Sequence, residues 1–236
     1  MNEGIIIFAR ISSKRLYGKA FSKVGDQTIL DRIVRKLKIY NKYKLIVATS
    51  KKKEDQQILN YCKKNNIHSF CGSLNNVLKR ALECAKYYNL SRFARVCADR
   101  PLVNYNLIDK FMKIHRNEGL DLMTNVFPPT FPKGLTTEII STKSLLNINK
   151  IATREFDREH ITNFFYSNSK KFKIKNYSYP NGDYSYLSAT VDEKKDLKKL
   201  DWIIKKLKIN NSEEKISAII HTLLSWEIQN LSSNAE

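Results

Sequence analysis

The sequence is poor in the residues that build cross-linked, membrane-spanning or repetitive proteins. Its 236 residues include seven glycines, five prolines and four cysteines. The cysteines, at positions 62, 71, 84 and 97, form no C-x-x-C pair, which argues against a metal-binding role and favours reduced thiols in a cytoplasmic protein. The longest apolar runs, such as residues 4–9, fall far short of the roughly 20 residues that a membrane helix needs. We therefore expect no membrane span, and the N-terminus lacks the pattern of a secretory signal.

What the chain does contain is typical of a folded α/β protein. Hydrophobic residues make up 42% of the sequence and aromatic residues 11%, which excludes a disordered class. The length suits one large domain with a sizeable core. We expect residues 1–236 to form that single domain.

The charge is strongly one-sided. Lysine and arginine number 42 against 23 acidic residues, so the formal net charge is +19. A nucleic-acid-binding surface is one interpretation. The other is an ordinary solvated surface, because the lysines spread over the whole chain and accompany many asparagines and isoleucines, a bias that an AT-rich genome produces. We favour the second interpretation and expect no nucleic-acid partner.

The first half of the chain alternates apolar runs of strand length with segments of helical period. Strands are predicted at residues 4–9, 44–49 and 92–98, and helices at 26–40, 54–65, 74–88 and 104–116. This β-α-β-α order indicates a mostly parallel, doubly wound sheet with crossover helices.

The pattern changes after about residue 120. Further strands are predicted at residues 120–127, 136–141, 172–179 and 184–191, followed by helices at 193–207 and 212–231. We expect the doubly wound core to comprise residues 1–125 and the chain from 186 onward. Between them, residues 126–185 would form a small mixed lobe.

The richest segment for chemistry follows the first predicted strand. It reads Ala9-Arg10-Ile11-Ser12-Ser13-Lys14-Arg15-Leu16-Tyr17-Gly18-Lys19, with four cations, two hydroxyls and a glycine. In an open α/β sheet, ligands bind beyond the carboxyl ends of the strands, where this segment lies. Cations and backbone amides there suit a triphosphate, although the segment is neither a P-loop nor a dinucleotide fingerprint. An ordinary basic surface loop is the alternative.

The pattern A-R-x-x-S-x-R-L-x-G-K after an N-terminal strand resembles the signature of the cytidylyltransferases that make CMP-activated acidic sugars, in the branch related to the spore-coat protein SpsF. Further blocks resemble that branch in the same order along the chain. They are Ala48-Thr49-Ser50 with Asp55, Gly72-Ser73, Val77-Leu78-Lys79-Arg80, Arg95 with Ala98-Asp99-Arg100-Pro101-Leu102, Gly134-Leu135-Thr136-Thr137-Glu138, Arg158-Glu159-His160-Ile161-Thr162, and Thr190-Val191-Asp192 with Asp196-Leu197. Two departures bear on the acceptor: Arg100 stands where a small or acidic residue is usual, and Thr136 where aspartate is frequent.

The resemblance implies a Rossmann-like nucleotide-diphospho-sugar transferase fold and a set of site residues. The catalytic residues it implies are Arg10, Arg15, Lys19 and Asp99. Nucleotide contacts fall to Ala9, Arg10, Ser13, Lys19, Arg80 and Asp99, and acceptor contacts to Glu138, Arg158 and His160. Asp99 and Asp192 would bind Mg²⁺, and residues 126–185 would complete the acceptor site and a homodimer interface.

Several of these residues have simpler interpretations. Arg80 lies in a predicted helix, where an arginine usually solvates a surface. His160 stands among apolar residues and is equally typical of a structural histidine. Asp99 closes a predicted strand, where aspartate is often a turn residue. Asp192 directly precedes a predicted helix and suits an N-cap.

Because the resembling blocks follow one another in the family's order, the resemblance predicts an enzyme. It would transfer CMP from CTP to a small sugar acid, releasing pyrophosphate, in surface polysaccharide or glycoconjugate synthesis. Within the enzyme class, the alternative is another acceptor or nucleotide. Outside it, the alternatives are a non-enzymatic RNA-binding α/β protein and a degenerate relative that acts as an assembly partner.

Overall fold

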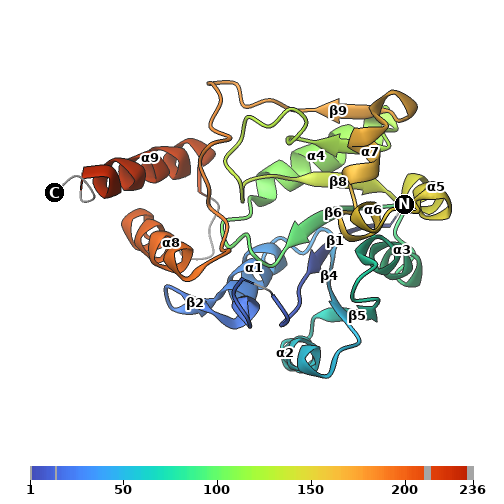
Figure 1. Cartoon of the computed structure of the whole chain (residues 1–236), viewed down its shortest axis with the longest axis horizontal. Helices are drawn as coiled ribbons and strands as arrows, with labels where there is room; N and C mark the ends of the chain where they lie inside the picture. Colours follow the sequence, from blue (N-terminus) through green and yellow to red (C-terminus); the bar gives the residue numbers. More distant parts are fainter. Residues whose placement is uncertain (1, 14, 210–213, 233–236) are drawn as a thin grey trace.

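One sheet runs through the middle of the molecule, with helices on both of its faces (Figure 1). The computed structural model describes residues 2–13, 15–209 and 214–232. Within them, the main sheet has seven strands in the order β5-β4-β1-β6-β8-β7-β9. The strands are β1 (Glu3–Phe8), β4 (Lys44–Ser50), β5 (His68–Gly72), β6 (Arg92–Cys97), β7 (Leu122–Thr124), β8 (Glu138–Ser141) and β9 (Ile174–Asn176). A separate hairpin pairs β2 (Lys23–Val24) with β3 (Gln27–Thr28).

The helices alternate with the strands through the first half of the chain, as predicted. They are α1 (Ile29–Lys38), α2 (Gln56–Lys64), α3 (Val77–Tyr87), α4 (Tyr105–Glu118), α5 (Thr142–Ile151), α6 (Glu155–Glu159), α7 (Asn163–Ser167), α8 (Lys194–Leu207) and α9 (Ile216–Ser232). Side chains cap several of their first turns: Thr28, Asn76 and Asn104 each accept a hydrogen bond from a backbone N–H three residues on. The helix predicted at 212–231 is α9, and residues 212 and 213 lie outside the described part of the chain.

Strand alternation divides the core into two layers. Ile5 and Ile7 of β1 point to the layer that holds α1, α4 and α8, whereas Ile6 and Phe8 point to the layer that holds α3 and α5. All of these β1 side chains are buried. Each fully buried isoleucine contributes about 1.5–3 kcal/mol relative to an exposed one. A central strand buried on both faces explains why β1 reads as a continuous apolar run.

Parallel pairing joins β1 to β4 and β6, and β4 to β5, so their carboxyl ends meet at one edge of the sheet. The middle of the chain extends this same sheet. β8 pairs antiparallel with β6, and β7 and β9 follow it. The mostly parallel sheet of the prediction is confirmed. The mixed part of the sheet, formed by β8, β7 and β9, extends the main sheet.

The strand predicted at residues 184–191 is wrong: no strand forms in that segment. β1 and β6 already have a neighbour on each side, so the segment finds no free strand edge among them. It crosses the carboxyl edge instead and hydrogen-bonds to Lys133 and Asp99. None of the helices in the described residues is long and apolar enough to cross a membrane.

Candidate active site

The loop after β1 is closed at its base by a buried carboxylate. Asp55, which is fully buried, accepts hydrogen bonds from the backbone N–H groups of Ile11 at 2.7 Å and Ser50 at 3.2 Å. The N–H of Gly18 donates to the carbonyl of Ile11 at 2.9 Å. Gly18 has φ of 70°, a conformation that favours glycine. These bonds fix both ends of the loop; Lys14 lies outside the described residues.

Lys19 brings the two predicted metal ligands together. Its ammonium lies 3.5 Å from Asp99 Oδ2 and 3.2 Å from Asp192 Oδ1, and it also donates to the carbonyl of Val191 at 3.0 Å. Arg15 Nη2 lies 2.7 Å from the same Asp192 oxygen. Two carboxylates that are 93 positions apart in the sequence therefore share one small volume with two cations.

A backbone bond places Asp192 there. The N–H of Val191 donates to the carbonyl of Asp99 at 2.9 Å, which ties the C-terminal segment to the end of β6. The interpretation of Asp192 as an N-cap is wrong, because Glu193 is the N-cap of α8 and forms a capping box with Asp196. The Asp192 side chain is free to face Lys19 and Arg15.

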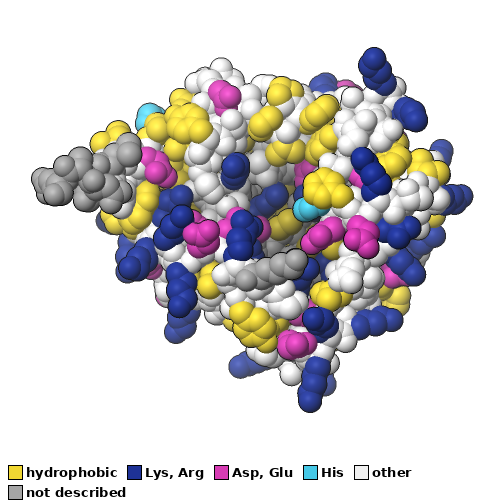
Figure 2. All heavy atoms as spheres, in the orientation of Figure 1, with side chains coloured by type: hydrophobic (Ala, Val, Ile, Leu, Met, Phe, Trp, Pro, Cys, Tyr) yellow, Lys and Arg dark blue, Asp and Glu magenta, His cyan; other side chains and the backbone are white. Residues whose placement is uncertain are grey.

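These residues line a cavity of about 530 Å³ at the carboxyl edge of the sheet. That volume lies within the roughly 300–1,000 Å³ of small-molecule sites. Figure 2 shows basic and acidic side chains gathered around a hollow near the centre of this face. The predicted site residues in its wall are Ala9, Arg10, Ser13, Arg15, Lys19, Arg80, Asp99, His160 and Asp192.

The pair of acids fits a magnesium ion that arrives with a nucleotide. Asp99 Oδ1 is buried and has no hydrogen-bond partner among the described residues; Arg100 Nε is 3.8 Å from it. The described residues hold no group of three or more His, Cys, Asp or Glu side chains placed for a metal. Mg²⁺ commonly uses one or two carboxylates and takes its other ligands from phosphates and water. The donor set therefore suits Mg²⁺ bound together with a triphosphate.

Arg80 does not solvate a surface, although it lies on a helix. Its side chain is buried, and Nη1 donates to the carbonyl of Ser73 at 3.0 Å. Its guanidinium lies over the ring of Phe8, 5.8 Å from the centroid. Burial, and next the charge of Arg10, lower the pKa of Arg80 to about 10. A buried cation with a lowered pKa gains from an anionic ligand in the same cavity.

Glu138 is in a different place from the other predicted acceptor residues. It is buried behind the cavity wall, where Oε2 accepts a hydrogen bond from Arg95 Nη1 and Oε1 accepts one from the Tyr166 hydroxyl. Arg95, and not Glu138, lines the cavity. Sequence reasoning missed Arg95 as a site residue, although the R-x-x-x-D block that contains it was a usable signal.

Arg158 lines a neighbouring cavity of about 320 Å³, together with Arg10, Ser73 and Asn76. Its Nε donates to the carbonyl of Ala152 at 3.2 Å. The two cavities share Arg10 and Glu159, which form an ion pair at 3.7 Å. Arg158 and His160 thus belong to adjoining parts of one polar cleft.

The two departures from the family pattern contact each other. Arg100 Nη1 donates to the carbonyl of Thr136 at 3.0 Å. The bond joins the segment after β6 to the segment before β8. An aspartate side chain at position 136 is therefore not needed to hold this arginine.

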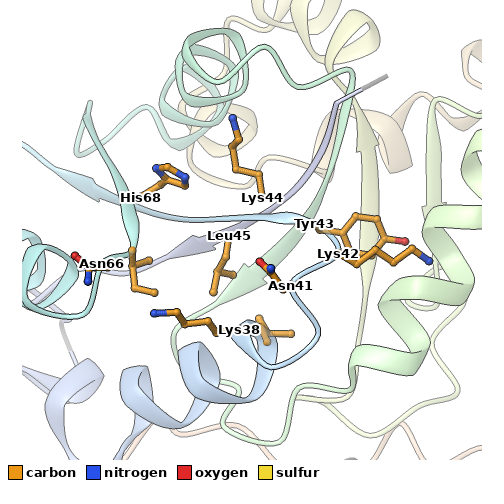
Figure 3. Close-up of a pocket in the computed structure, with 10 residues that line it drawn as sticks. Lys38, Asn41, Lys42, Tyr43, Lys44, Leu45, Asn66 and His68 are labelled. Atoms are coloured by element: carbon orange, nitrogen blue, oxygen red, sulfur yellow. The ribbon is translucent and has the colours of Figure 1, made fainter.

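A separate pocket, of about 370 Å³, lies where β4 and β5 begin (Figure 3). Lys38, Lys42, Lys44 and His68 line it, so it is basic as well. Its lysines are engaged: Lys38 donates to the carbonyl of Asn65 at 2.9 Å, Lys42 pairs with Asp109, and Lys44 lies over the ring of Tyr88. It has no carboxylate among its lining residues.

A cationic cavity at the carboxyl edge of a parallel sheet is typical of a nucleotide-binding α/β protein, and Asp99 and Asp192 suit a metal that accompanies the phosphates. The comparisons with known proteins identify which kind. The chain belongs to the cytidylyltransferase family, whose family model matches residues 4–228.

Three similar proteins illustrate this membership. The spore coat polysaccharide biosynthesis protein SpsF of Bacillus subtilis is 28% identical over 175 residues, which cover 72% of each chain. The solved structure of a cytidylyltransferase from Leptospira borgpetersenii has a TM-score of 0.89 and 30% identity, covering 95% of this chain and 94% of that one. CMP:2-keto-3-deoxy-manno-octonic acid synthetase, solved with CTP, has a TM-score of 0.67 at 14% identity, covers 88% of this chain and 100% of that one, and shows the shared fold.

Proposed function

We propose that this protein transfers CMP from CTP to a hydroxyl of a small sugar acid and releases pyrophosphate, with Mg²⁺ as its cofactor. The observation that carries the proposal is the meeting of Asp99 and Asp192 at Lys19 inside the cavity. Membership of the cytidylyltransferase family supports the transfer of a cytidylyl group. The CTP complex of the synthetase with the same fold supports the choice of nucleotide.

The loop after β1 would bind the triphosphate. Arg10, Arg15 and Lys19 supply three positive charges, and Ser13 supplies a hydroxyl donor. Arg15 and Lys19 now pair with Asp192, and the triphosphate would take over both cations. Binding would thus free the carboxylates as it neutralises the loop. Such fixed charges stabilise the leaving pyrophosphate in the transition state.

Asp99 and Asp192 would hold the magnesium ion once Lys19 turns to the phosphates. Bound there, the ion would supply charge neutralisation at the phosphate oxygens. The nucleoside would lie against Ala9 and Arg80, which both line the cavity. Arg80 is fixed by its bond to Ser73, and we assign it to the nucleotide.

The reaction needs positioning more than it needs a protein nucleophile. The acceptor oxygen forms a bond to the α-phosphorus while the bond from that phosphorus to the β-phosphate oxygen breaks. The acceptor proton leaves to water and pyrophosphate departs with the electron pair of the broken bond. Holding both substrates in line and stabilising charge supplies most of the rate in reactions of this type.

The acceptor would lie on the side of Arg158 and His160, next to the strands and helices of residues 126–185. SpsF is a protein of spore coat polysaccharide biosynthesis, which supports an acceptor of sugar type. The synthetase of the same fold acts on 2-keto-3-deoxy-manno-octonic acid, which supports a sugar acid as acceptor. A homodimer formed through residues 126–185 and a cytoplasmic location remain predictions.

Pyrophosphate release tests this function. The protein, CTP and Mg²⁺ are incubated with 2-keto sugar acids, neutral sugars and sugar phosphates in parallel, and ATP, GTP and UTP replace CTP in turn. We expect release with CTP and an acid acceptor. No release with any acceptor, and no change in thermal stability with CTP and Mg²⁺, would contradict the proposal. Steeply salt-dependent RNA binding that is indifferent to Asp99 would favour the RNA-binding alternative.

A further inference from the structure

Arg95 and Glu138 form a largely buried ion pair beside the cavity. Arg95 of β6 and Glu138 of β8 are direct cross-strand partners in the antiparallel register. Their neighbours along the same sheet face, Phe93 and Ile140, are fully buried apolar residues. The Arg95 side chain is 19% exposed and lines the cavity, whereas Glu138 is 3% exposed. The pair therefore presents only its cation to a ligand.

Glu138 is held from both of its oxygens. Oε2 accepts from Arg95 Nη1, and Oε1 accepts from the Tyr166 hydroxyl at 2.6 Å. The Tyr166 hydroxyl is also 3.0 Å from Thr124 Oγ1. Burial alone would raise the pKa of Glu138, but the charges of Arg95 and Arg100 and the bond from Tyr166 outweigh it, so the pKa stays below its ordinary value. Glu138 is thus a carboxylate held in a fixed position next to Arg95.

Much of the hydrogen-bonding capacity of Arg95 is open. A guanidinium has five N–H donors in a planar fork. The bond to Glu138 uses one of them, and Arg95 Nε is buried without a partner among the described residues. A buried ion pair is seldom worth its desolvation for stability alone. An arginine that one carboxylate orients, and that keeps unused N–H donors, is suited to bind a second carboxylate through bidentate hydrogen bonds.

We propose that Arg95 binds the carboxylate of the acceptor, and that Glu138 and Tyr166 are positioning residues that hold its guanidinium for this contact. The inference rests on the proposed function. Charge favours this partner over the triphosphate: Arg95 already shares its charge with Glu138, which suits an anion of single charge. The triphosphate has Arg10, Arg15 and Lys19 on the loop.

Substitutions at the pair separate acceptor binding from CTP binding. Arg95→Lys keeps the charge but loses the fork, and Tyr166→Phe removes only the hydroxyl that holds Glu138. We expect Arg95→Lys to raise the acceptor KM about 10–100-fold and Tyr166→Phe to raise it about 3–10-fold, because bonds to charged groups are strong and indirect support is weaker. The dissociation constant of CTP with Mg²⁺, measured by calorimetry without acceptor, should change less than about 3-fold.

Arg92→Lys is the matched control. Arg92 lies three residues earlier on the same strand and also forms an ion pair, with Glu3 at 3.1 Å, but it does not line the cavity. This variant should leave the acceptor KM unchanged even where it lowers the unfolding temperature. A purely structural role for Arg95 predicts the same behaviour in both variants, which would overturn the inference.

A second experiment varies the acceptor. The probe is 2-keto-3-deoxy-manno-octonic acid, tested alongside further 2-keto sugar acids, and each acid is compared with its C1 carboxamide. Wild-type enzyme should prefer the acid, and Arg95→Gln should reduce that preference at least about 10-fold, the loss of one charged contact. Equal turnover of acid and carboxamide by wild-type enzyme, or release with neutral acceptors only, would refute the role of Arg95 while leaving cytidylyl transfer intact. Absence of turnover with every acceptor, together with absence of CTP binding, would remove the proposed function and this inference with it.

Discussion

The two edges of the sheet carry charges of the same kinds but use them differently. At the amino edge, Glu3 pairs with Arg92 and Arg116, and Asp109 accepts hydrogen bonds from Tyr43, Lys42 and Lys113. At the carboxyl edge, Asp99 and Asp192 share Lys19 and Arg15, and the loop charges border a cavity. The amino-edge networks tie α4 to the strands. The carboxyl-edge network joins the loop after β1 to Asp99 at the end of β6 and to Asp192, which lies outside the sheet.

The comparison separates two roles of charged side chains in this fold. Ion pairs that hold helices and strands together contribute to stability. Charges that meet across a cavity, with Asp99 Oδ1 lacking a hydrogen-bond partner among the described residues, can exchange those partners for a ligand. The same substitution, aspartate to asparagine, should therefore have opposite consequences at the two edges.

The largest expected effect is on activity at the carboxyl edge. Asp99→Asn removes one of the two carboxylates and should lower kcat at least about 100-fold, as expected for loss of a principal electrostatic contact. Its midpoint of urea unfolding should stay within experimental error of wild type, because its partners are cations on the cavity wall. Pyrophosphate release and urea titration measure the two quantities, and unchanged turnover would break the comparison.

Glu3→Gln should show the converse. Its side chain is 8% exposed, and the substitution removes the negative charge that Arg92 and Arg116 share. We expect a loss of about 2–4 kcal/mol in the free energy of unfolding, the cost of breaking a largely buried pair. The KM values for CTP and acceptor should not change. A stable variant with impaired catalysis would show that the amino edge is not merely structural.

Gly134→Ala sharpens the comparison because it acts on the link between the sheet and Asp192. Gly134 has φ of 94°, and an added Cβ would lie 2.6 Å from the carbonyl oxygen of Ala189. The segment that carries Asp192 must shift, so we expect about 1–3 kcal/mol of destabilisation from backbone strain and a loss of turnover. Gly119→Ala, with φ of 59° but open space around the Cβ, is the control and should lose stability only.

The smallest effect is a pH dependence at the amino edge. Burial alone would raise the pKa of Asp109, but hydrogen bonds from Lys113, Lys42 and Tyr43 outweigh it and hold the pKa well below its ordinary value. A carboxylate with a lowered folded pKa stabilises the protein above its unfolded pKa of about 3.9, and this stability is lost as pH falls through the folded pKa. Asp109→Asn should therefore cost about 1–2 kcal/mol at pH 7 and progressively less below about pH 4. A pH-independent difference would contradict this account, and activity should be retained.

The sequence was most informative where local pattern and topology coincide. The apolar runs of β1, β4 and β6 predicted a parallel sheet, and that in turn placed Arg10, Lys19 and Asp99 at one edge. The cap of α8 was harder to predict, because Asp192 is a preferred N-cap residue type, whereas the observed N-cap is Glu193, which forms a capping box with Asp196.

Other features depend on contacts between distant segments. Residues 184–191 have a strand-like pattern but cross the ends of β1 and β6, which already have a neighbour on each side. Glu138 was predicted at the acceptor, yet its contact with Arg95 follows from the antiparallel register of β6 and β8. Asp55 closes the loop by a bond to Ile11, 44 positions away. Such pairings depend on tertiary structure, which periodicity along one chain does not encode.

Calorimetric titration of CTP with Mg²⁺ into wild-type protein and into Asp192→Asn tests the central claim most directly. If Asp192 reaches the cavity as described, wild-type protein binds the nucleotide and the variant loses at least about 10-fold in Mg²⁺-dependent affinity, the loss of one charged contact. Equal binding by both proteins, with the same dependence on Mg²⁺, would contradict the assignment of this edge as the nucleotide and metal site.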